Sequence, residues 1–263
     1  MTTLNEAYEV YWTRLQESAR YHPANRFRYA LIFSRLKCIL KPGMSVLDMG
    51  CGDARLIRRL QSAWPQNVFA GCDISQQIIR YNSDEHPGIG FFQADVSSRD
   101  FLEKAFACQA NGFDVVISSE VIEHVENDAG LLQNAARILA PGGYLVLTTQ
   151  SGPRYRVDKE LLHHLRHYRR ADLETMVRRE GLEIVDSFNC GFPVLTLQKM
   201  IANAMFDTVM RSAAASTKPP APVRAVMSVM YVLMRVAPKL SGPQIVLVAR
   251  RAVASQGRGQ NEG

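Results

Sequence analysis

The sequence lacks paired cysteines, long apolar runs and a strong charge of either sign. None of its five cysteines forms a Cys-x-x-Cys pair, which excludes a zinc knuckle or dithiol redox motif of that type. No apolar run approaches the roughly 20 residues that a membrane span needs. Residues 1–10 contain Asn5, Glu6 and Glu9 in place of an apolar core, so we expect no signal peptide and a cytoplasmic protein.

The charge of the chain is only mildly basic. There are 31 lysines and arginines against 25 acidic residues, a net charge of +6 over 263 residues. This balance is compatible with an acidic substrate or a membrane surface, and it is too weak to indicate nucleic acid by itself. Apolar residues make up 47% of the chain, which suffices for the core of one elaborated domain.

Short apolar runs alternate with helical patterns from residue 45 onward. Strands are expected at residues 46–49, 68–72, 89–92, 113–117, 144–148, 182–188 and 244–248. Helices are expected between them at residues 54–63, 75–82, 99–107, 128–139 and 171–180. This alternation, with short loops that contain glycine and proline, predicts an α/β fold with a doubly wound, mostly parallel sheet covered by helices on both faces.

Four regions are expected along the chain. Residues 1–42 form N-terminal helices that end at Pro42-Gly43 and either pack on the sheet edge or cover a ligand. Residues 43–192 form the ligand-binding core, residues 193–243 a helical insertion, and residues 244–263 the last strand with a polar tail.

Acids or glycines lie at the carboxyl end of each of the first four predicted strands. They are Asp48 with Gly50 and Gly52, then Asp73, then Asp95, and finally Ser119 with Glu120. Because the carboxyl ends of parallel strands meet at one edge of the sheet, ligands bind there. Glycine permits a sharp turn, and the helix that follows presents free N–H groups. We therefore predict a nucleoside site at this edge, where the carboxylate of Asp73 suits the two hydroxyls of a ribose.

The order and spacing of four motifs resemble the class I S-adenosylmethionine-dependent methyltransferases. The motifs are Val46-Leu47-Asp48-Met49-Gly50-Cys51-Gly52, Gly71-Cys72-Asp73-Ile74-Ser75, Gln93-Ala94-Asp95 and Leu139-Ala140-Pro141-Gly142-Gly143, within residues 41–188. A nicotinamide-dependent dehydrogenase is the competing class, but it would need a third glycine where this chain has Asp53-Ala54-Arg55. The resemblance implies a Rossmann-like fold and S-adenosylmethionine as the cofactor.

The resemblance also implies roles for single residues at the cofactor site. Asp73 would hold the ribose and Asp95 the adenine amino group, while the first loop would hold the methionine end, with Asp48 supporting its geometry. The full set that it implies is Asp48, Gly50, Cys51, Gly52, Asp73, Ile74, Asp95, Val96, Ser119 and Glu120.

Residues 119–126 contain acidic groups and an imidazole where an acceptor would bind. If this stretch is helical, Glu120 shares a face with Glu123 and His124. Two carboxylates and an imidazole can hold a divalent metal such as manganese, cobalt or zinc. Acids at the start of a helix are also stabilised by the helix dipole without any metal.

A later histidine extends this pattern. Glu-x-x-Glu-His followed by a histidine is similar to ubiquinone-pathway O-methyltransferases and small-RNA 3′-terminal 2′-O-methyltransferases, in which a metal binds the acceptor hydroxyls. The similarity implies a metal site formed by Glu120, Glu123, His124 and His167. General-base catalysis by His124 or His167, with Glu123 beside them, is the alternative without a metal, and both mechanisms stay open.

Several arginines follow the fifth predicted strand. Arg154 and Arg156 come directly after it, where they could bind a carboxylate or phosphate of the acceptor. Arg178 and Arg179 are instead expected on a solvated helix face.

Residues 193–243 are far longer than a tight connection requires. They predict two amphipathic helices, each with a polar stripe backed by apolar residues. The stripes consist of Thr196, Lys199, Asn203, Asp207 and Arg211 in the first helix, and of Arg224, Ser228, Tyr231 and Arg235 in the second. The helices either pack on the domain or on a second subunit, or they form a methionine-rich cover for an apolar acceptor or a peripheral membrane contact.

Together these patterns predict an enzyme that transfers the methyl group of S-adenosylmethionine to a hydroxyl of a small lipophilic or glycosidic metabolite. A metal-dependent RNA 2′-O-methyltransferase and a non-catalytic, cofactor-binding partner subunit are the alternatives. The modest charge and the lack of interleaved basic and aromatic stripes disfavour nucleic acid as the substrate. Glu123, His124 and His167 disfavour the non-catalytic subunit, and a homodimer stays open.

Overall fold

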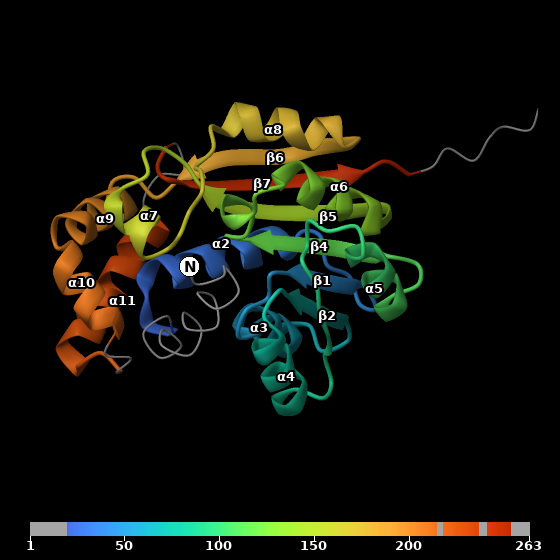
Figure 1. Cartoon of the computed structure of the whole chain (residues 1–263), viewed down its shortest axis with the longest axis horizontal. Helices are drawn as coiled ribbons and strands as arrows, with labels where there is room; N and C mark the ends of the chain where they lie inside the picture. Colours follow the sequence, from blue (N-terminus) through green and yellow to red (C-terminus); the bar gives the residue numbers. More distant parts are fainter. Residues whose placement is uncertain (1–19, 215–217, 237–240, 254–263) are drawn as a thin grey trace, which may run out of the picture.

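A computed structural model of the chain describes residues 20–214, 218–236 and 241–253 (Figure 1). Seven strands of these residues form one sheet in the order β3-β2-β1-β4-β5-β7-β6. Their bounds are β1 Ser45–Met49, β2 Val68–Asp73, β3 Gly90–Gln93, β4 Phe113–Ser119, β5 Leu139–Gln150, β6 Leu182–Cys190 and β7 Gln244–Arg251. β7 runs antiparallel to β5 and β6, and the other neighbouring strands are parallel. The predicted α/β fold with a mostly parallel sheet is confirmed.

Helices cover both faces of the sheet. The helix bounds are α2 Pro23–Leu36, α3 Arg55–Ala63, α4 Gln76–Glu85, α5 Phe101–Cys108, α6 Asp128–Ile138, α7 Arg156–Glu160 and α8 Arg170–Arg179. One core lies under α2, α3 and α4, where Ile32 and Ile57 pack with Val46. The other lies under α5, α6 and α8, where Leu131 packs with Leu47. Neighbouring residues of β1 therefore contribute to opposite cores, as the two-residue period of a strand requires.

β5 is longer than the sequence predicts. It begins at Leu139, which pairs with Phe113, and the register then shifts before Val115 pairs with Tyr144. This irregularity accommodates the Pro-Gly-Gly segment inside the strand, whereas the sequence pattern placed a turn there.

The insertion lies beyond the carboxyl ends of the parallel strands (Figure 1). It contains α9 Val194–Ala204, α10 Phe206–Ala214 and α11 Ala221–Val236. The prediction of one continuous first helix is wrong, because the chain breaks at Met205 and turns the buried Phe206 inward beneath the guanidinium of Arg156. α11 packs on α2, and Leu195 and Met234 join Phe27 in a third apolar cluster.

The N-terminal helices are described only in part. α2 begins at Pro23, whose fixed φ suits the first turn of a helix, and it ends at Leu36 before Pro42-Gly43. α2 packs on the sheet and on α11, in accord with the expectation of a helix at the sheet. Residues 1–19 of the predicted N-terminal helices lie outside the described residues.

Candidate active site

The first loop turns tightly after β1. Gly50 has a φ of +80°, which favours glycine, and Gly52 follows with a φ of +50°. A Cβ atom on Gly50 would lie 2.5 Å from Cγ2 of Val121, so no side chain fits there. The N–H groups of Gly50 and of the buried Cys51 donate to the carbonyl of Cys72 at 2.8 and 2.9 Å. The loop is therefore held against the end of β2 and the segment that follows β4.

Asp73 ends β2 beside this loop and is buried. Its Oδ2 accepts a hydrogen bond from the Gly52 N–H, and its Oδ1 accepts one from the Ser75 N–H, both at 3.0 Å. Burial raises the pKa of Asp73, although these main-chain N–H groups oppose the rise. The buried Asn82 of α4 donates to the carbonyl of Gly52 at 2.7 Å, a contact that sequence reasoning missed. The end of β2 and helix α4 thus both hold the glycine loop in place.

Asp48 is a buried carboxyl group within β1. Its side chain is 2% exposed, and its Oδ1 atom has no hydrogen-bond partner among the described residues. Burial raises the pKa of Asp48 to about 7, and the charge of Asp73 adds to the rise, while Arg28 opposes it. A carboxyl group with so perturbed a pKa at a strand end is typical of a functional site.

We expect Asp48→Asn to stabilise the cofactor-free protein above pH 7. Because the pKa of Asp48 is higher in the folded chain than in the unfolded chain, its contribution to the free energy of unfolding is full below about pH 4 and is lost as the pH rises to about 7. Asparagine has no such loss, so the variant should gain about 2 kcal/mol or more at pH 8 relative to pH 4. Urea denaturation at both pH values measures this. Asp84→Asn on α4 is the exposed control, and a gain independent of pH would contradict the assignment.

The remaining predicted cofactor residues lie at the same edge of the sheet. Asp95 follows β3 and is exposed, and its Oδ1 accepts hydrogen bonds from the N–H and hydroxyl of Ser97 at 2.9 and 2.8 Å. Val96 beside it is buried. Ile74 follows β2 and Ser119 ends β4, so the structure brings these positions to the carboxyl ends of adjacent strands.

Glu120 does not lie on a helix. It has a φ of +56°, and the single turn η1 (Ile122–His124) begins only after it. Its carboxylate lies 3.7 Å from the guanidinium of Arg28 and accepts hydrogen bonds from the side-chain amides of Gln150 and Gln244. Burial raises the pKa of Glu120, but Arg28 and the two amides together lower it below its usual value. The prediction that Glu120 shares a helical face with Glu123 and His124 is therefore wrong.

Sequence reasoning missed the residues that hold Glu120. Gln150 and Gln244 are register partners on the antiparallel strands β5 and β7. Lys199 of α9 donates to the Gln150 side chain at 3.1 Å and lies 3.1 Å from the buried carboxylate of Asp158. Gln150 lies 49 residues before Lys199 and 94 residues before Gln244, so no local spacing connects these residues.

Glu123 is fully buried in η1. Its Oε2 accepts a hydrogen bond from the Thr149 hydroxyl at 2.8 Å, whereas its Oε1 has no hydrogen-bond partner among the described residues. Burial raises the pKa of Glu123 well above its usual value, and the negative charge of Glu120 adds to the rise. A buried oxygen without a partner is costly, so a bound proton or cation would stabilise this side chain.

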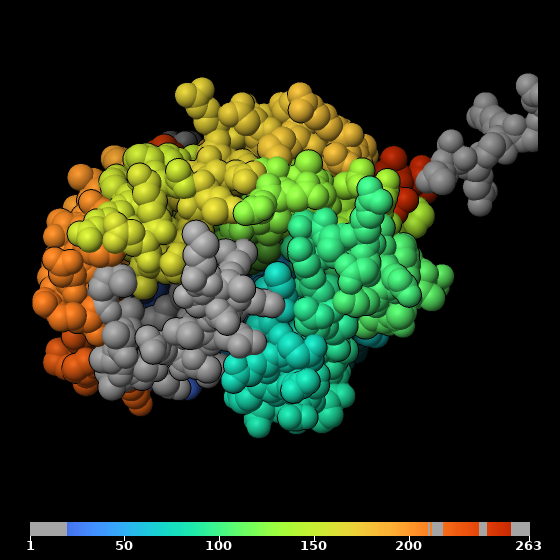
Figure 2. All heavy atoms as spheres, in the orientation of Figure 1, coloured from blue at the N-terminus to red at the C-terminus, as the bar shows by residue number. Residues whose placement is uncertain are grey.

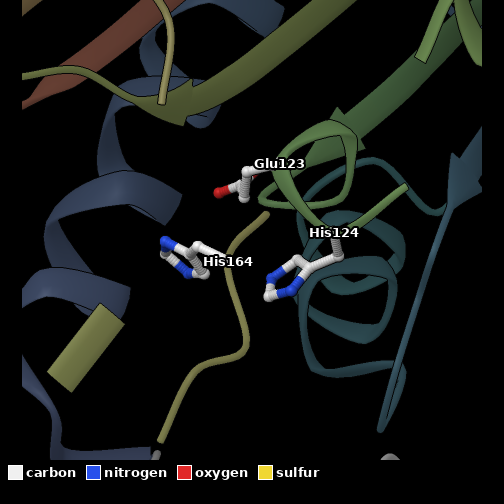
Figure 3. Close-up of side chains that lie close together, drawn as sticks. All are labelled: Glu123, His124 and His164. Atoms are coloured by element: carbon white, nitrogen blue, oxygen red, sulfur yellow. The ribbon is translucent and has the colours of Figure 1, made fainter. Parts of the chain in front are cut away.

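Two imidazoles lie beside Glu123 (Figure 3). The rings of His124 and His164 meet edge to face with their centroids 4.8 Å apart. One ligand atom from each of Glu123, His124 and His164 lies within 4.8 Å of the others. Burial lowers the pKa of His124 to about 4 and that of His164 to about 2, so both rings are neutral near pH 7.

The structure places His164, and not His167, beside Glu123 and His124. His167 lies one step further out, with its Nε2 2.9 Å from Nδ1 of His164 and its Nδ1 3.2 Å from the carbonyl of Gly152. The prediction that His167 lies with Glu123 and His124 is therefore wrong, because His164 occupies this place. Burial lowers the pKa of His167 as well, and the nearby Lys199 adds to the effect.

The two arginines after β5 have partners within the protein. Arg154 donates to the main-chain carbonyls of His164 and Leu165, which fixes the loop that carries the histidine. The guanidinium of Arg156 pairs with Glu160 at 2.9 Å. Both side chains therefore support local structure, and neither reaches the glycine loop or Glu123 in the contacts that the described residues show.

The comparison with known families decides the class. Residues 22–187 match a family described as a methyltransferase domain, which is more than half of the chain. The chain belongs to this family. Together with the motifs and the sheet order, this makes it a class I S-adenosylmethionine-dependent methyltransferase, and S-adenosylmethionine is the cofactor of its family.

Similar proteins include two ubiquinone biosynthesis O-methyltransferases. The one from Actinobacillus pleuropneumoniae is 29% identical over 110 residues, which cover 41% of this chain and 46% of the relative. The one from Xanthomonas axonopodis is 27% identical over 179 residues, which cover 63% of this chain and 72% of the relative. The methyltransferase thus spans less than half the length of the first of these relatives.

A solved structure shows the same fold with the cofactor bound. It is phosphoethanolamine N-methyltransferase 2 of Haemonchus contortus in complex with S-adenosyl-L-methionine. The TM-score is 0.54 at 16% identity, and the match covers 92% of this chain and 60% of the other. At this identity the likeness shows the fold alone.

Proposed function

We propose that this methyltransferase transfers the methyl group of S-adenosylmethionine to a hydroxyl oxygen of a small lipophilic or glycosidic metabolite. The sulfonium donor needs no activation, whereas a hydroxyl acceptor must lose a proton as it reacts. The observation that carries the proposal is the group of Glu123, His124 and His164, a buried carboxyl group with two neutral imidazoles.

The cofactor is proposed to lie along the carboxyl edge of β1, β2 and β3. Asp73 would bind the ribose hydroxyls and Asp95 the adenine amino group, while residues 50–52 would hold the methionine end with support from Asp48. The exposed carboxylate of Asp95 and the glycine loop fixed on Asp73 support this orientation. It directs the methyl end toward β4 and therefore toward Glu123.

A chain of hydrogen bonds sets the basic nitrogen of His164. The carbonyl of Gly152 can only accept, so Nδ1 of His167 carries a proton, and Nε2 of the same neutral ring must accept. Nδ1 of His164 then donates to His167, which leaves Nε2 of His164 without a proton. This nitrogen of His164 can accept a hydrogen bond from the acceptor hydroxyl or bind a metal ion, with His167 and Gly152 as the groups that fix its tautomer.

A cavity of about 180 Å³ supports a small acceptor. It lies between the segment after β5 and helix α9, and it is lined by Ser151, Gly152, Pro153, Tyr155, Thr196, Lys199, Gly242 and Pro243. Because Gly152 both lines the cavity and accepts from His167, the cavity adjoins the histidine chain. The ammonium group of Lys199 lies in the wall of this cavity.

A divalent metal is the second way to activate the acceptor. Glu123, His124 and His164 offer one carboxylate oxygen and two imidazole nitrogens, a donor set that fits zinc, manganese or cobalt. The unpartnered Oε1 of Glu123 supports this fit. When bound, such a metal would lower the pKa of the acceptor hydroxyl. The donor set omits Glu120, whose carboxylate is held by Arg28.

Transfer of a labelled methyl group tests the proposed function. The full chain is incubated with methyl-labelled S-adenosylmethionine and cell extract, and the labelled product is isolated and its new bond identified. We expect label in a methyl ether or methyl ester of a small metabolite. Label on nitrogen or carbon, or label confined to RNA, would contradict the proposal.

A chelator separates the two mechanisms. If a metal serves the reaction, a strong chelator should abolish transfer, added divalent metal should restore it, and elemental analysis should find metal in the wild type and not in Glu123→Gln. Full transfer in chelator with no bound metal leaves general-base catalysis through the histidines.

A further inference from the structure

The outward faces of two insertion helices are apolar. On α9, Leu197, Met200 and Ile201 are 56%, 52% and 48% exposed. On α11 the exposed apolar residues, at 43% to 74%, are Val223, Val226, Val229, Val232, Leu233 and Val236. We call these nine residues the outer face. A helix of a soluble domain normally turns such a stripe toward the core, so outward apolar stripes on two helices that contact each other mark an interaction surface.

The polar stripes of the same helices face inward. Lys199 of α9 contacts the buried Asp158 at 3.1 Å. On α11, Ser228 accepts a hydrogen bond from Arg26 of α2 at 3.1 Å, and the guanidinium of Arg26 lies 4.2 Å from the centre of the Tyr231 ring. The polar side of each helix is thus used in holding it to the domain, which leaves the apolar side for a partner.

The insertion carries almost all of the net charge. Residues 193–243 contain six lysines and arginines against one acid, Asp207, whereas the rest of the chain contains 25 against 24. Neither α9 nor α11 contains an acidic residue. A cationic segment with an apolar face complements an anionic lipid surface. A second copy of the chain would instead bring like charges together across the contact.

We propose that the outer face docks on the surface of an anionic lipid bilayer, with α9 and α11 lying in the plane of the interface. No helix of the described residues is long and apolar enough to cross a membrane. The 16 residues of α11 extend about 24 Å along the surface. The insertion forms one end of the molecule (orange in Figure 2).

Docking in this way places the acceptor cavity next to the bilayer. Thr196 and Lys199 of α9 line the cavity, while Leu197 and Ile201 lie on the outer face of the same helix. One helix therefore separates the bilayer from the cavity, and a lipophilic acceptor has a short path between them. This docking is independent of the proposed chemistry, because it concerns where the enzyme lies and not which bond it forms.

Co-sedimentation with vesicles tests the proposal. The full chain is mixed with vesicles of phosphatidylcholine alone or with an equal part of phosphatidylglycerol. We expect binding to the anionic vesicles that weakens as salt is added. The double variant Val226→Asp/Val229→Asp should lower the partition coefficient by about tenfold or more, because two apolar contacts are lost and two negative charges are added.

A matched control adds the same charges elsewhere. Val185→Asp/Val253→Asp changes two valines that are 55% and 64% exposed outside the insertion, and it should bind vesicles like the wild type. Unchanged affinity of all variants for S-adenosylhomocysteine shows that they fold. Equal partition of the two double variants would overturn the proposal. So would a wild-type dimer that ignores anionic vesicles and that Val226→Asp/Val229→Asp converts to a monomer, because a second copy would then cover the outer face.

Discussion

Asp73→Ala is expected to weaken the binding of S-adenosylhomocysteine by about 100-fold or more. The proposed ribose contacts are two hydrogen bonds to a carboxylate, and hydrogen bonds to a charged group contribute about 1.5 kcal/mol or more each. Loss of both amounts to about 3 kcal/mol, which corresponds to about 100-fold in affinity. The main-chain hydrogen bonds from Gly52 and Ser75 would be lost as well, which would loosen the glycine loop. Isothermal titration calorimetry with the demethylated cofactor measures the effect.

The control for this variant is Asp84→Ala, which removes an exposed acid from the neighbouring helix α4. It should leave the affinity unchanged within about twofold, since exposed charges far from a ligand contribute little. If Asp73→Ala binds the demethylated cofactor as tightly as the wild type while remaining folded, the cofactor does not use the end of β2. The proposed orientation of the nucleoside would then be wrong.

The gathering of the glycine loop and the acids at one edge of the sheet was predictable because its determinants are local. A strand, a glycine turn and a helix start follow one another within a few residues, and only glycine fits where a Cβ atom would meet Val121. The acids Asp48 and Asp73 each lie at the end of an apolar run, and parallel pairing brings such ends together. The expected strands and core helices correspond to observed elements, with β5 starting earlier than predicted.

The surroundings of Glu120 and Glu123 were harder to predict because their determinants are distant in the chain. The spacing of Glu120, Glu123 and His124 fits a helix, but the positive φ at Glu120 and its ion pair with Arg28 of α2 direct that carboxylate elsewhere. His164 and His167 are three residues apart, and the loop after the positive φ of His163 decides which ring reaches Glu123. Spacing alone does not report such a loop conformation.

The orientation of helix α11 could not be predicted from hydrophobic periodicity either. A hydrophobic pattern finds the two sides of a helix, but it does not say which side the domain uses. Here the polar stripe of α11 packs on Arg26, and the valines remain outside. Arg26 lies about 200 positions earlier in the chain than its partner Ser228, so the orientation of α11 was visible only in the structure.

Glu123→Gln is expected to lower the rate constant of methyl transfer by about 100-fold to 10,000-fold, because Glu123 is either a ligand of the proposed metal or an acid-base partner of the neighbouring imidazoles, and acid-base groups contribute in this range. The glutamine oxygen can still accept from Thr149, so the fold should persist. Affinity for S-adenosylhomocysteine should change little, because Glu123 lies outside the cofactor loop. Single-turnover kinetics with the identified acceptor separates the chemical step from binding. Glu126→Gln, an exposed acid three residues later, is the matched control and should react like the wild type.

The raised pKa of Glu123 distinguishes a chemical role from a structural one. A buried carboxyl group that is protonated in the folded chain becomes destabilising as the pH rises toward its folded pKa, so glutamine should preserve or increase the free energy of unfolding at neutral pH. A slower reaction in a protein of equal or greater stability therefore assigns Glu123 to the reaction. Loss of stability in parallel with loss of rate would mean that the buried carboxyl group serves packing alone, and the assignment of this group as the acceptor site would fail.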